Sequence, residues 1–389
     1  MIYFEEEMIA LTRQHLRRDL SEITPSDLAT TLVSHGKTLL NFSSNNYLGL
    51  TNHPVLISAA VTAIKNGGTG GSASRLISGN NPFYPEIEHR LAKFKSTESA
   101  LVFSSGYMTN LGALQTLVKK GDLIFADRLS HASLIDGARL SEGTFRVYPH
   151  KDTEQLAKLL RRRKPQQRGW IITDGIFSMD GDIAPLPELL RLAQEFDASI
   201  YLDDAHATGV LGPNGRGTCD HFGISNARII QMGTLSKALA GLGGFIASDR
   251  SVIEYLVNKA RPFIYTTALP PALLAASVAA LDLVEKEPLL RKRLWDHTRY
   301  VREKINQLGF DTGASETPII PMVIGKTETA LAFAQKLMEE GVYLPAIRPP
   351  TVPEGTSRLR ISLMSTHTDA QIQHLLDAIE RIGKELRLI

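Results

Sequence analysis

The chain has 389 residues, of which 43% are hydrophobic and 22% are charged. This composition excludes a disordered tail, and the length predicts roughly two or three domains. The 43 basic and 41 acidic residues leave a net charge of +2, so bulk charge indicates neither a nucleic acid nor a membrane as partner. The one cysteine, Cys219, excludes an internal disulfide. With an acidic N-terminus and no long apolar run, we expect a soluble, cytoplasmic protein.

Residues 1–45 are expected to form an N-terminal arm, made of a polar amphipathic helix and a short hairpin-like piece. Arg17 and Arg18 are expected on this helix, in a basic cluster with Arg13. Two interpretations are open for the pair: a solvated surface or a contact with an anionic ligand.

Residues 46–270 are expected to form a large α/β domain. Short apolar runs alternate with helix-period segments between residues 100 and 248. Continuous apolar runs of this kind indicate a mainly parallel sheet, covered by helices on both faces. The seven predicted strands are 100–104, 122–127, 145–150, 170–174, 199–203, 228–232 and 243–248.

Residues 271–389 are expected to form a connector helix and a small α+β domain. An Ala- and Leu-rich helix begins with paired prolines and is followed by a charged amphipathic helix. Strands and helices then alternate in a shorter unit. The predicted strands are 319–324, 342–347 and 358–363, and the predicted helices are 328–340 and 369–386.

Polar side chains follow several predicted strands, at the edge where open α/β sheets bind ligands. Gly106 and Tyr107 lie where a strand ends and a helix begins, so this turn is either a phosphate site or a simple connection. His131 follows the next strand, as a stacking partner for a planar ligand or as a helix cap. The acidic loop 173–182 is either a magnesium site or, as we favour, a turn whose Asp side chains cap backbone amides.

Asp203 and His206 follow the apolar run 200–202. A buried acid is costly unless it meets a cation, so we expect a positive group to face Asp203 or Asp204. Two ligands are too few for zinc, and we expect no metal. Lys237 lies between a predicted strand and a glycine-rich turn, where the alternatives are an ordinary loop lysine and a desolvated Schiff-base lysine.

These features together form the set that pyridoxal 5′-phosphate (PLP) requires: a helix N-terminus for the phosphate, a stacking ring, an acid for the pyridine nitrogen and an amine for the aldehyde. Over nearly the whole chain, the sequence resembles the α-oxoamine synthases, a family of fold-type I PLP enzymes. The motifs that carry this resemblance are 41–50, 127–131, 177–181, 203–209 and 234–237.

The resemblance implies a role for each candidate residue. Lys237 would bind the aldehyde of PLP, Asp203 would pair with the pyridinium nitrogen, and His131 would stack on the ring. The remaining implied contacts are His206 and Ser178 to the ring oxygen, Gly106, Tyr107 and Thr234 to the phosphate, and Thr266 and Thr267 to the phosphate across a homodimer.

The resemblance also implies an acyltransferase that joins an amino acid to an acyl thioester with loss of carbon dioxide. Motifs 209–217 and 347–353 are most similar to the branch that uses L-alanine and a pimeloyl thioester, on coenzyme A or an acyl carrier protein, in biotin biosynthesis. The alternatives are a branch that uses glycine and acetyl-CoA, and a PLP-binding dimer without activity. The expected substrate contacts are Arg360 to the amino-acid carboxylate, Asn45 and His131, and Thr351, Arg17 or Arg18 to the acyl chain.

The sequence departs from the family pattern in two places. Ala240 stands where many relatives have glycine, and Ser72 to Arg75 vary within the glycine-rich substrate loop. These departures bear on the choice between alanine and glycine, which differ by one methyl group worth about 1–3 kcal/mol.

Overall fold

The computed structural model describes residues 2–14 and 16–389, which form two compact units. The large unit comprises residues 50–178 and 183–291. The small unit comprises the described part of residues 1–49 together with residues 179–182 and 292–389. The boundaries expected at residues 45 and 270 stay predictions.

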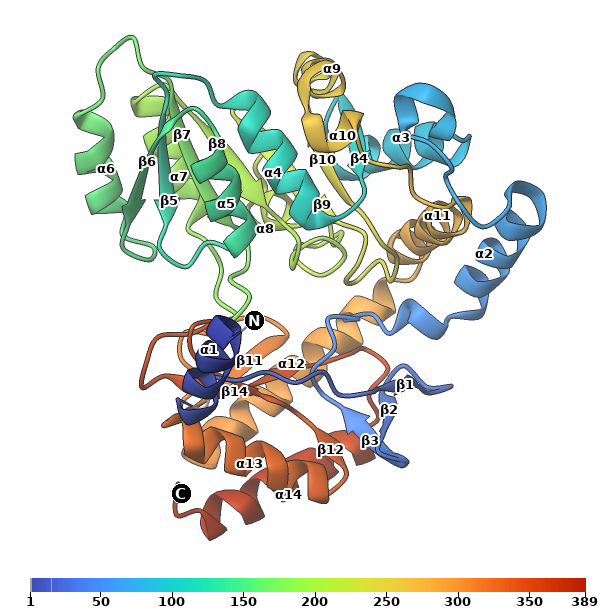
Figure 1. Ribbon diagram of the computed structural model, residues 1–389, viewed down its shortest axis with the longest axis vertical. Coiled ribbons are helices and arrows are strands. Elements are labelled where there is room, and N and C mark those ends of the chain that lie inside the picture. The colour runs from blue at the N-terminus through green and yellow to red at the C-terminus, as the bar shows by residue number, and fades with distance from the viewer. Residues whose placement is uncertain (1, 15) are drawn as a thin grey trace. The chain divides into compact units, whose positions relative to one another are not determined.

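A seven-stranded sheet forms the centre of the large unit (Figure 1). Its order is β4-β10-β9-β8-β7-β5-β6; β10 runs antiparallel to both neighbours, and the other adjacent pairs are parallel. The predicted mainly parallel α/β sheet is therefore confirmed. Its strands are β4 (Ser99–Phe103), β5 (Leu123–Asp127), β6 (Thr144–Tyr148), β7 (Gly169–Asp174), β8 (Ala198–Asp203), β9 (Ile229–Thr234) and β10 (Gly244–Ser248).

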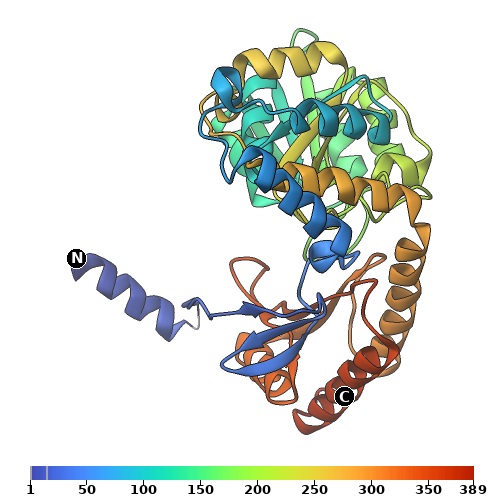
Figure 2. The ribbon, with the colours of Figure 1, turned by 90° about the vertical axis from the view of Figure 1, so that its right-hand side faces the viewer.

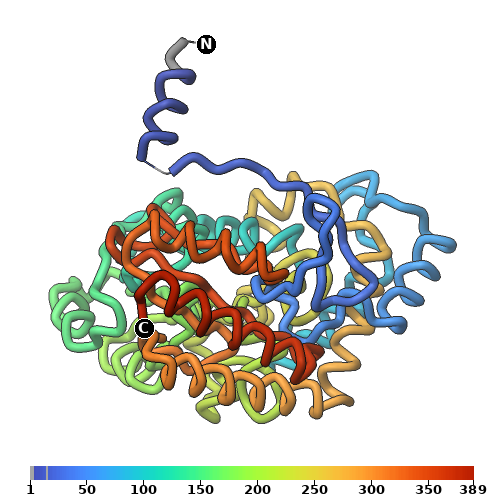
Figure 3. The backbone as a smooth tube through the Cα atoms, turned by 90° about the horizontal axis from the view of Figure 1, so that it is seen from below, coloured from blue at the N-terminus to red at the C-terminus, as the bar shows by residue number. Residues whose placement is uncertain are grey.

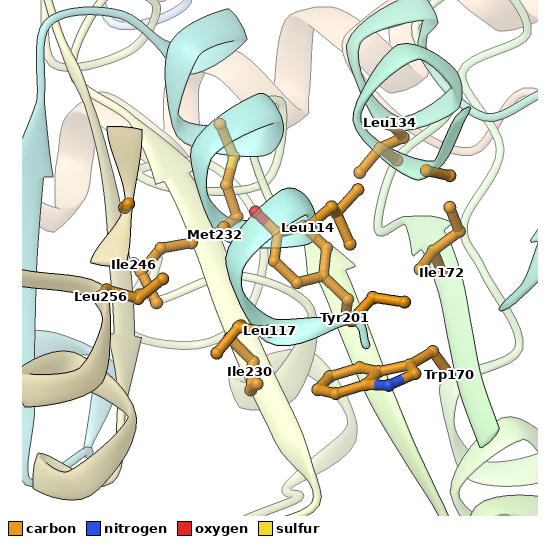
Figure 4. Packing of buried hydrophobic residues seen from close by; sticks show 14 of the residues in the cluster. Leu114, Leu117, Leu134, Trp170, Ile172, Tyr201, Ile230, Met232, Ile246 and Leu256 are labelled. Carbon is orange, nitrogen blue, oxygen red and sulfur yellow. The ribbon is translucent and has the colours of Figure 1, made fainter. Parts of the chain in front are cut away.

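Helices cover both faces of this sheet. One face packs against α4 (Gly106–Leu117), α5 (Ala132–Leu140), α9 (Arg250–Lys259) and α10 (Arg261–Ile264), and Figure 4 shows part of this core. The other face packs against α6 (Thr153–Arg161), α7 (Leu186–Glu195) and α8 (Thr218–Phe222). The other helical elements of the large unit are η1 (Leu50–Asn52), α2 (Pro54–Gly67), the π-helical turn η2 (Arg75–Gly79), α3 (Phe83–Lys95) and α11 (Pro271–Lys286).

The strand directions bring six carboxyl ends to one edge of the sheet, and five of them lead into the predicted site residues. Strands β5, β7, β8 and β9 are parallel, and β4 shares their direction because β4 and β9 both pair antiparallel with β10. The residues at this edge are Phe103, Asp127, Asp174, Asp203 and Thr234. Side chains that follow these strands therefore lie along the same edge of the sheet.

Two small sheets and four helices build the small unit. One sheet has the order β1-β2-β3-β12 and the other β11-β14-β13. Figure 2 shows α1 extending away from β1, β2 and β3, and in Figure 3 helices α13 and α14 run side by side. The elements are α1 (Ile2–Arg13), β1 (Thr24–Pro25), β2 (Thr31–Ser34), β3 (Lys37–Asn41), α12 (Pro288–Gln307), β11 (Ile319–Gly325), α13 (Thr327–Glu339), β12 (Val342–Tyr343), β13 (Ala346–Ile347), β14 (Ser357–Ser362) and α14 (Asp369–Glu385).

The single strand predicted over residues 342–347 is wrong. The structure has two short strands here: β12 pairs with β3, and β13 pairs with β14 in the other sheet. Pro345 lies between them and has no N–H group to donate to a ladder, so the strand is interrupted there. None of the described helices is both long and apolar enough to cross a membrane.

Candidate active site

The first helix after β4 presents its N-terminus at the edge described above. Ser105 caps α4 by accepting a hydrogen bond from Met108 N at 3.2 Å. The next N–H groups, of Gly106 and Tyr107, belong to the first turn, where backbone donors have no partner within the helix. A Cβ atom on Gly106 would lie 3.4 Å from Thr234 Oγ1. Gly106, Tyr107 and Thr234 therefore come together, as the predicted phosphate site requires.

Tyr107 and His131 lie next to each other. Their rings are 6.4 Å apart in an edge-to-face arrangement, and the Tyr107 hydroxyl is hydrogen-bonded to Asp136. His131 is also the N-cap of α5, where its Nδ1 accepts from Ser133 N. The helix-cap interpretation of His131 is therefore right, and it is compatible with a ring that stacks on a ligand.

The His131 ring favours the neutral form. Burial lowers the pKa of His131; the nearby Asp203 charge raises it and the Lys237 charge lowers it. These effects show that His131, Asp203 and Lys237 lie within electrostatic reach of one another. A neutral imidazole can stack on a cationic ring without repulsion.

Asp203 is a buried carboxylate whose hydrogen-bond donors are neutral. Its Oδ1 accepts from Ala205 N at 2.9 Å, and its Oδ2 accepts from Asn110 Nδ2 at 2.7 Å. Neutral donors do not balance the charge of a buried carboxylate, so the site suits a cationic ligand such as a pyridinium ring.

Asn110 is a site residue that sequence reasoning missed. It is 1% exposed, and its Nδ2 also donates to Ser133 Oγ at 2.8 Å, while its Oδ1 accepts from the Tyr201 hydroxyl at 2.9 Å. Ser133 Oγ is in turn 2.7 Å from His131 Nδ1. No sequence signal marks an amide in the second turn of a helix, because its importance depends on the strands beneath it.

Asp174 is the second residue that was missed. It is paired with Asp203 across β7 and β8, and its Oδ2 accepts from His131 N at 2.9 Å. Burial and the Asp203 charge raise the pKa of Asp174 well above its ordinary value. Asp174 therefore favours the protonated, neutral form.

The cation expected for the two aspartates faces Asp204. Lys95 Nζ lies 2.9 Å from Asp204 Oδ2, and both side chains are fully buried. Asp204 also accepts from Thr218 N at 3.1 Å and from Thr218 Oγ1 at 2.6 Å. The expectation is therefore confirmed for Asp204.

Lys237 lies in the turn between β9 and β10 and is partly buried. Ala240 N donates to Lys237 O at 3.0 Å, and Leu235 N donates to Gly243 O at 3.0 Å, so the turn is closed by its own backbone. Thr234 Oγ1 donates to Gly243 O at 2.8 Å and is 2.7 Å from Ser236 Oγ. The turn therefore presents Lys237 beside Thr234 at the ligand-binding edge of the sheet.

The remaining predicted residues of the large unit lie in three turns. His206 is buried three residues after Asp203, and Ser178 is partly buried beyond β7. Thr267 is exposed, and its neighbour Thr266 is partly buried. Thr267 forms a β-bridge with Ser74. Among the described residues, no three His, Cys, Asp or Glu side chains lie together in a way that could hold a metal.

Two predicted substrate residues meet within the small unit. Arg360 is 8% exposed, and its Nη2 donates to Asn45 Oδ1 at 3.2 Å while its Nη1 donates to Ser362 Oγ at 2.8 Å. Burial raises the pKa of the nearby Tyr47, and the Arg360 charge partly opposes this rise. The guanidinium is thus held in a fixed orientation by neutral oxygens.

The arm and the proline loop also meet within the small unit. Arg18 Nη2 donates to Thr351 Oγ1 at 3.4 Å, and Arg348 Nη2 donates to Arg17 O at 2.5 Å. Arg17 itself pairs with Asp19 on the surface. The structure therefore brings Arg18 and Thr351 together, and places the Arg17 guanidinium elsewhere.

The acidic loop 173–182 differs in part from the favoured interpretation. Asp174 does accept a backbone N–H, but Asp180 Oδ1 pairs with Arg358 Nη1 at 2.7 Å. Gly181 has φ +72°, and a Cβ there would lie 2.0 Å from Ile319 O, so the loop packs against β11 with no room for a side chain. Asp180 is therefore an ion-pair partner and not a cap.

These residues fit PLP. The N-terminus of α4 suits a dianionic phosphate, the neutral His131 suits a stacked ring, and Asp203, with its neutral hydrogen-bond donors, suits a protonated pyridine nitrogen. Lys237 supplies an amine at the same edge of the sheet. The fit rests on the neutral donor set of Asp203, because a purely structural aspartate would be expected to have a cation, as Asp204 does.

Comparison with known proteins supports the same assignment. The model of the family "Aminotransferase class I and II" matches residues 37–379. The chain is 46% identical to the 8-amino-7-oxononanoate synthase of Thermoanaerobacter pseudethanolicus, over 100% of this chain and 98% of that protein. It is 47% identical to that of Geobacter sulfurreducens, over 98% of each.

Solved structures agree with these relatives. The serine palmitoyltransferase of S. paucimobilis with PLP and myriocin bound has a TM-score of 0.94 and 32% identity, over 99% of this chain and 98% of that chain. The 8-amino-7-oxononanoate synthase from Francisella tularensis has a TM-score of 0.78 and 33% identity, over 90% of this chain and 98% of that chain. The predicted resemblance and fold type are confirmed, and so is membership of a family whose solved relatives hold PLP.

Proposed function

The chain belongs to the class I and II aminotransferase family and to its 8-amino-7-oxononanoate synthases, and we propose from this membership that it condenses L-alanine with a pimeloyl thioester. In this reaction a bond forms between the alanine Cα and the thioester carbonyl carbon, and the carbon–sulfur bond breaks. The alanine carboxylate leaves as carbon dioxide. The products are 8-amino-7-oxononanoate and the free thiol, in a step of biotin biosynthesis.

The observation that carries the proposal is the buried Asp203, which has neutral donors and lies within electrostatic reach of His131 and Lys237. When bound, PLP supplies an aldehyde that binds amines and a ring that accepts electrons from bonds broken at Cα. Asp203 would hold the proton on the pyridine nitrogen, and His131 would stack on the ring. Lys237 Nζ would hold the aldehyde and, once displaced by alanine, remove the Cα proton.

The other site residues complete this proposal. Gly106, Tyr107 and Thr234 would bind the phosphate, and His206 and Ser178 the ring oxygen. Arg360 would bind the alanine carboxylate, for which its planar guanidinium is suited. The assignment of Arg360 is supported by its hydrogen bonds to Asn45 and Ser362, because these neutral partners fix the orientation of the guanidinium.

We propose that Thr351 and Arg18 contact the pimeloyl chain. A pimeloyl group carries a carboxylate about seven carbons from the thioester, so it needs a remote polar or cationic contact that an acetyl group does not. The hydrogen bond between Arg18 and Thr351 supports this assignment, because it joins a cation to the predicted loop. Arg17 pairs with Asp19 and is the weaker candidate.

A homodimer is proposed for the working enzyme, with Thr266 and Thr267 reaching the phosphate site of the partner subunit. Thr267 is exposed, as a residue that acts on another subunit must be. Apolar side chains are also exposed on α2 and on η2, and the N-cap residue of η2, Ser74, forms a β-bridge with Thr267. These exposed side chains are Val55, Ile57, Val61, Ile64, Leu76 and Ile77. We further propose a cytoplasmic location, with the pimeloyl group on coenzyme A or on an acyl carrier protein.

The experiment is a turnover assay with matched substrate pairs. The purified protein with PLP is given alanine or glycine together with pimeloyl-CoA, pimeloyl-acyl carrier protein or acetyl-CoA, and products are identified by mass. We expect 8-amino-7-oxononanoate from alanine and at least one pimeloyl thioester. Turnover confined to glycine and acetyl-CoA would instead assign 2-amino-3-oxobutyrate CoA ligase activity, and no turnover with any pair would indicate a silent PLP-binding dimer.

A further inference from the structure

Asn110 joins the two side chains expected to contact the PLP ring. Its Nδ2 donates to Asp203 Oδ2 and to Ser133 Oγ, and Ser133 Oγ is hydrogen-bonded to His131 Nδ1. We infer that Asn110 is a positioning residue, which fixes Asp203 and His131 relative to each other and thereby fixes where the ring binds. The inference deepens the proposed function and rests on it, since it requires PLP at this site.

Tyr201 fixes the orientation of the Asn110 amide. Its hydroxyl donates to Asn110 Oδ1 at 2.9 Å, so the NH2 group must face Asp203 and Ser133. A flipped amide would place its oxygen against the Asp203 carboxylate. Burial and the Asp203 charge raise the pKa of Tyr201 well above its ordinary value, so the hydroxyl remains a donor.

The neutral amide preserves the charge of Asp203. A lysine or arginine at this position would neutralise the carboxylate, as Lys95 does for Asp204. The two hydrogen bonds to Asp203, from Asn110 and from Ala205 N, instead come from neutral donors and add no positive charge. The charge is therefore available to hold a proton on the pyridine nitrogen.

One helix would then position both ends of the cofactor. Asn110 lies one turn after Gly106 on α4, whose N-terminus forms the predicted phosphate site. The groups that Asn110 contacts on β8 are Tyr201 and Asp203, which lie two residues apart on that strand and so face the same side of the sheet. Figure 4 shows Tyr201 among the buried residues Leu114, Leu117 and Trp170, which hold its ring in place.

Two variants and one control test this inference. Asn110→Leu removes both donors while keeping the number and branching of the side-chain heavy atoms, and Tyr201→Phe removes only the hydroxyl that orients the amide. The control is Tyr148→Phe, because Tyr148 is an equally buried strand tyrosine whose hydroxyl bonds to Thr173 and not to Asn110. Tyr201→Phe keeps the test valid even if Asn110→Leu does not fold.

The dissociation constant of PLP and the ¹⁵N NMR shift of the bound pyridine nitrogen are measured for each variant. We expect Asn110→Leu to weaken PLP binding about tenfold, as for the loss of a hydrogen bond to a charged group, and Tyr201→Phe to weaken it less. In Asn110→Leu the ¹⁵N shift should move toward that of Asp203→Asn, the reference for a lost pyridinium partner. Tyr148→Phe should match the unmodified protein in both measurements.

A double variant separates positioning from general destabilisation. If Tyr201 acts through the amide, Asn110→Leu with Tyr201→Phe should bind PLP as Asn110→Leu does. The inference would be overturned if the losses of PLP affinity in the two single variants multiplied in the double variant, or if Asn110→Leu had an unchanged affinity and ¹⁵N shift. Either result would leave the proposed function intact. An unmodified protein that takes up no PLP would overturn both, so the two failures are distinguishable.

Discussion

Asp174 and Asp203 lie directly opposite each other on β7 and β8, and both carboxyl groups are buried. Two buried carboxylates this close cannot both ionise without a large cost in free energy. Burial and the Asp203 charge raise the pKa of Asp174, and its Oδ2 still accepts from His131 N. Asp174 therefore favours the neutral form and serves as a neutral support for His131.

The first prediction is that Asp174→Asn stabilises the PLP-free protein above about pH 4. A pKa that is raised in the folded state gives a contribution to stability that is present at low pH and is lost as pH rises. Asparagine keeps an acceptor for His131 N but never ionises. Urea unfolding between pH 4 and pH 8 should show that Asp174→Asn has a higher free energy of unfolding than the unmodified protein, by an amount that grows with pH.

Asp282→Asn provides a control of opposite sign. The hydrogen bond from Arg90 lowers the pKa of Asp282, so this variant should lose stability above its ordinary pKa, by a small amount because the pair is partly exposed. A stability difference for Asp174→Asn that does not vary with pH would contradict the protonated state.

The second prediction concerns acid unfolding through His367 in the small unit. Burial lowers the pKa of His367 from 6.5 to about 4; its Nδ1 accepts from Met364 N and its ring stacks on Phe42. A lowered histidine pKa gives stability that is present above pH 6.5 and is lost as pH falls toward 4. The lowering of the His367 pKa corresponds to about 3 kcal/mol of unfolding free energy.

His367→Asn keeps an acceptor for Met364 N and cannot titrate. The difference in unfolding free energy between pH 7 and pH 4 should therefore shrink by about 3 kcal/mol in this variant. Replacement of the exposed His221 by asparagine should leave the difference unchanged. If both variants keep the full pH dependence, another group controls acid unfolding.

The third prediction concerns Ala240, three residues after Lys237. Its φ is +54°, a left-handed conformation that costs a residue with a Cβ about 1–2 kcal/mol. Ala240→Gly should therefore raise the free energy of unfolding, by about 0.5–1 kcal/mol once the flexibility of glycine in the unfolded chain is included. The buried Ala238 lacks a positive φ, and Ala238→Gly should instead be destabilising. Thermal unfolding of both variants distinguishes local strain from a general effect of glycine.

The fourth prediction tests the acyl contact. Arg18→Ala and Thr351→Val should each raise KM for the pimeloyl thioester severalfold, because each removes one partner of a bond that orients the other. Exchange of the alanine Cα proton without thioester should stay near that of the unmodified protein. Arg17→Ala is the matched control, since its guanidinium pairs with Asp19. An equal rise in KM for Arg18→Ala and Arg17→Ala, with none for Thr351→Val, would indicate a general charge effect and contradict the assignment.

The strands and strand-end residues could be predicted because their signals are local. Continuous apolar runs mark buried parallel strands, and Asp203 and Lys237 directly follow such runs or the turns after them. The family resemblance then supplied their roles. The interruption of the strand at Pro345 could also have been inferred from the missing N–H group.

The contacts between distant segments could not be predicted. Lys95 neutralises Asp204 across 109 residues of sequence, and Asn110 reaches Asp203 across 93. The protonation of Asp174 depends on the register of two strands, which no single segment specifies. Each of these residues has an ordinary sequence context, and its effect arises from burial and from the charge of a neighbour.

The most direct test of the assignment is where PLP becomes attached. Borohydride reduction of the protein loaded with PLP, followed by peptide mapping, should place the pyridoxyl group on Lys237. The Lys237→Ala variant should bind PLP without being labelled, and its mixture with alanine and pimeloyl thioester should give no 8-amino-7-oxononanoate. A label on another lysine, or a protein that cannot be loaded with PLP at all, would contradict the proposed active site.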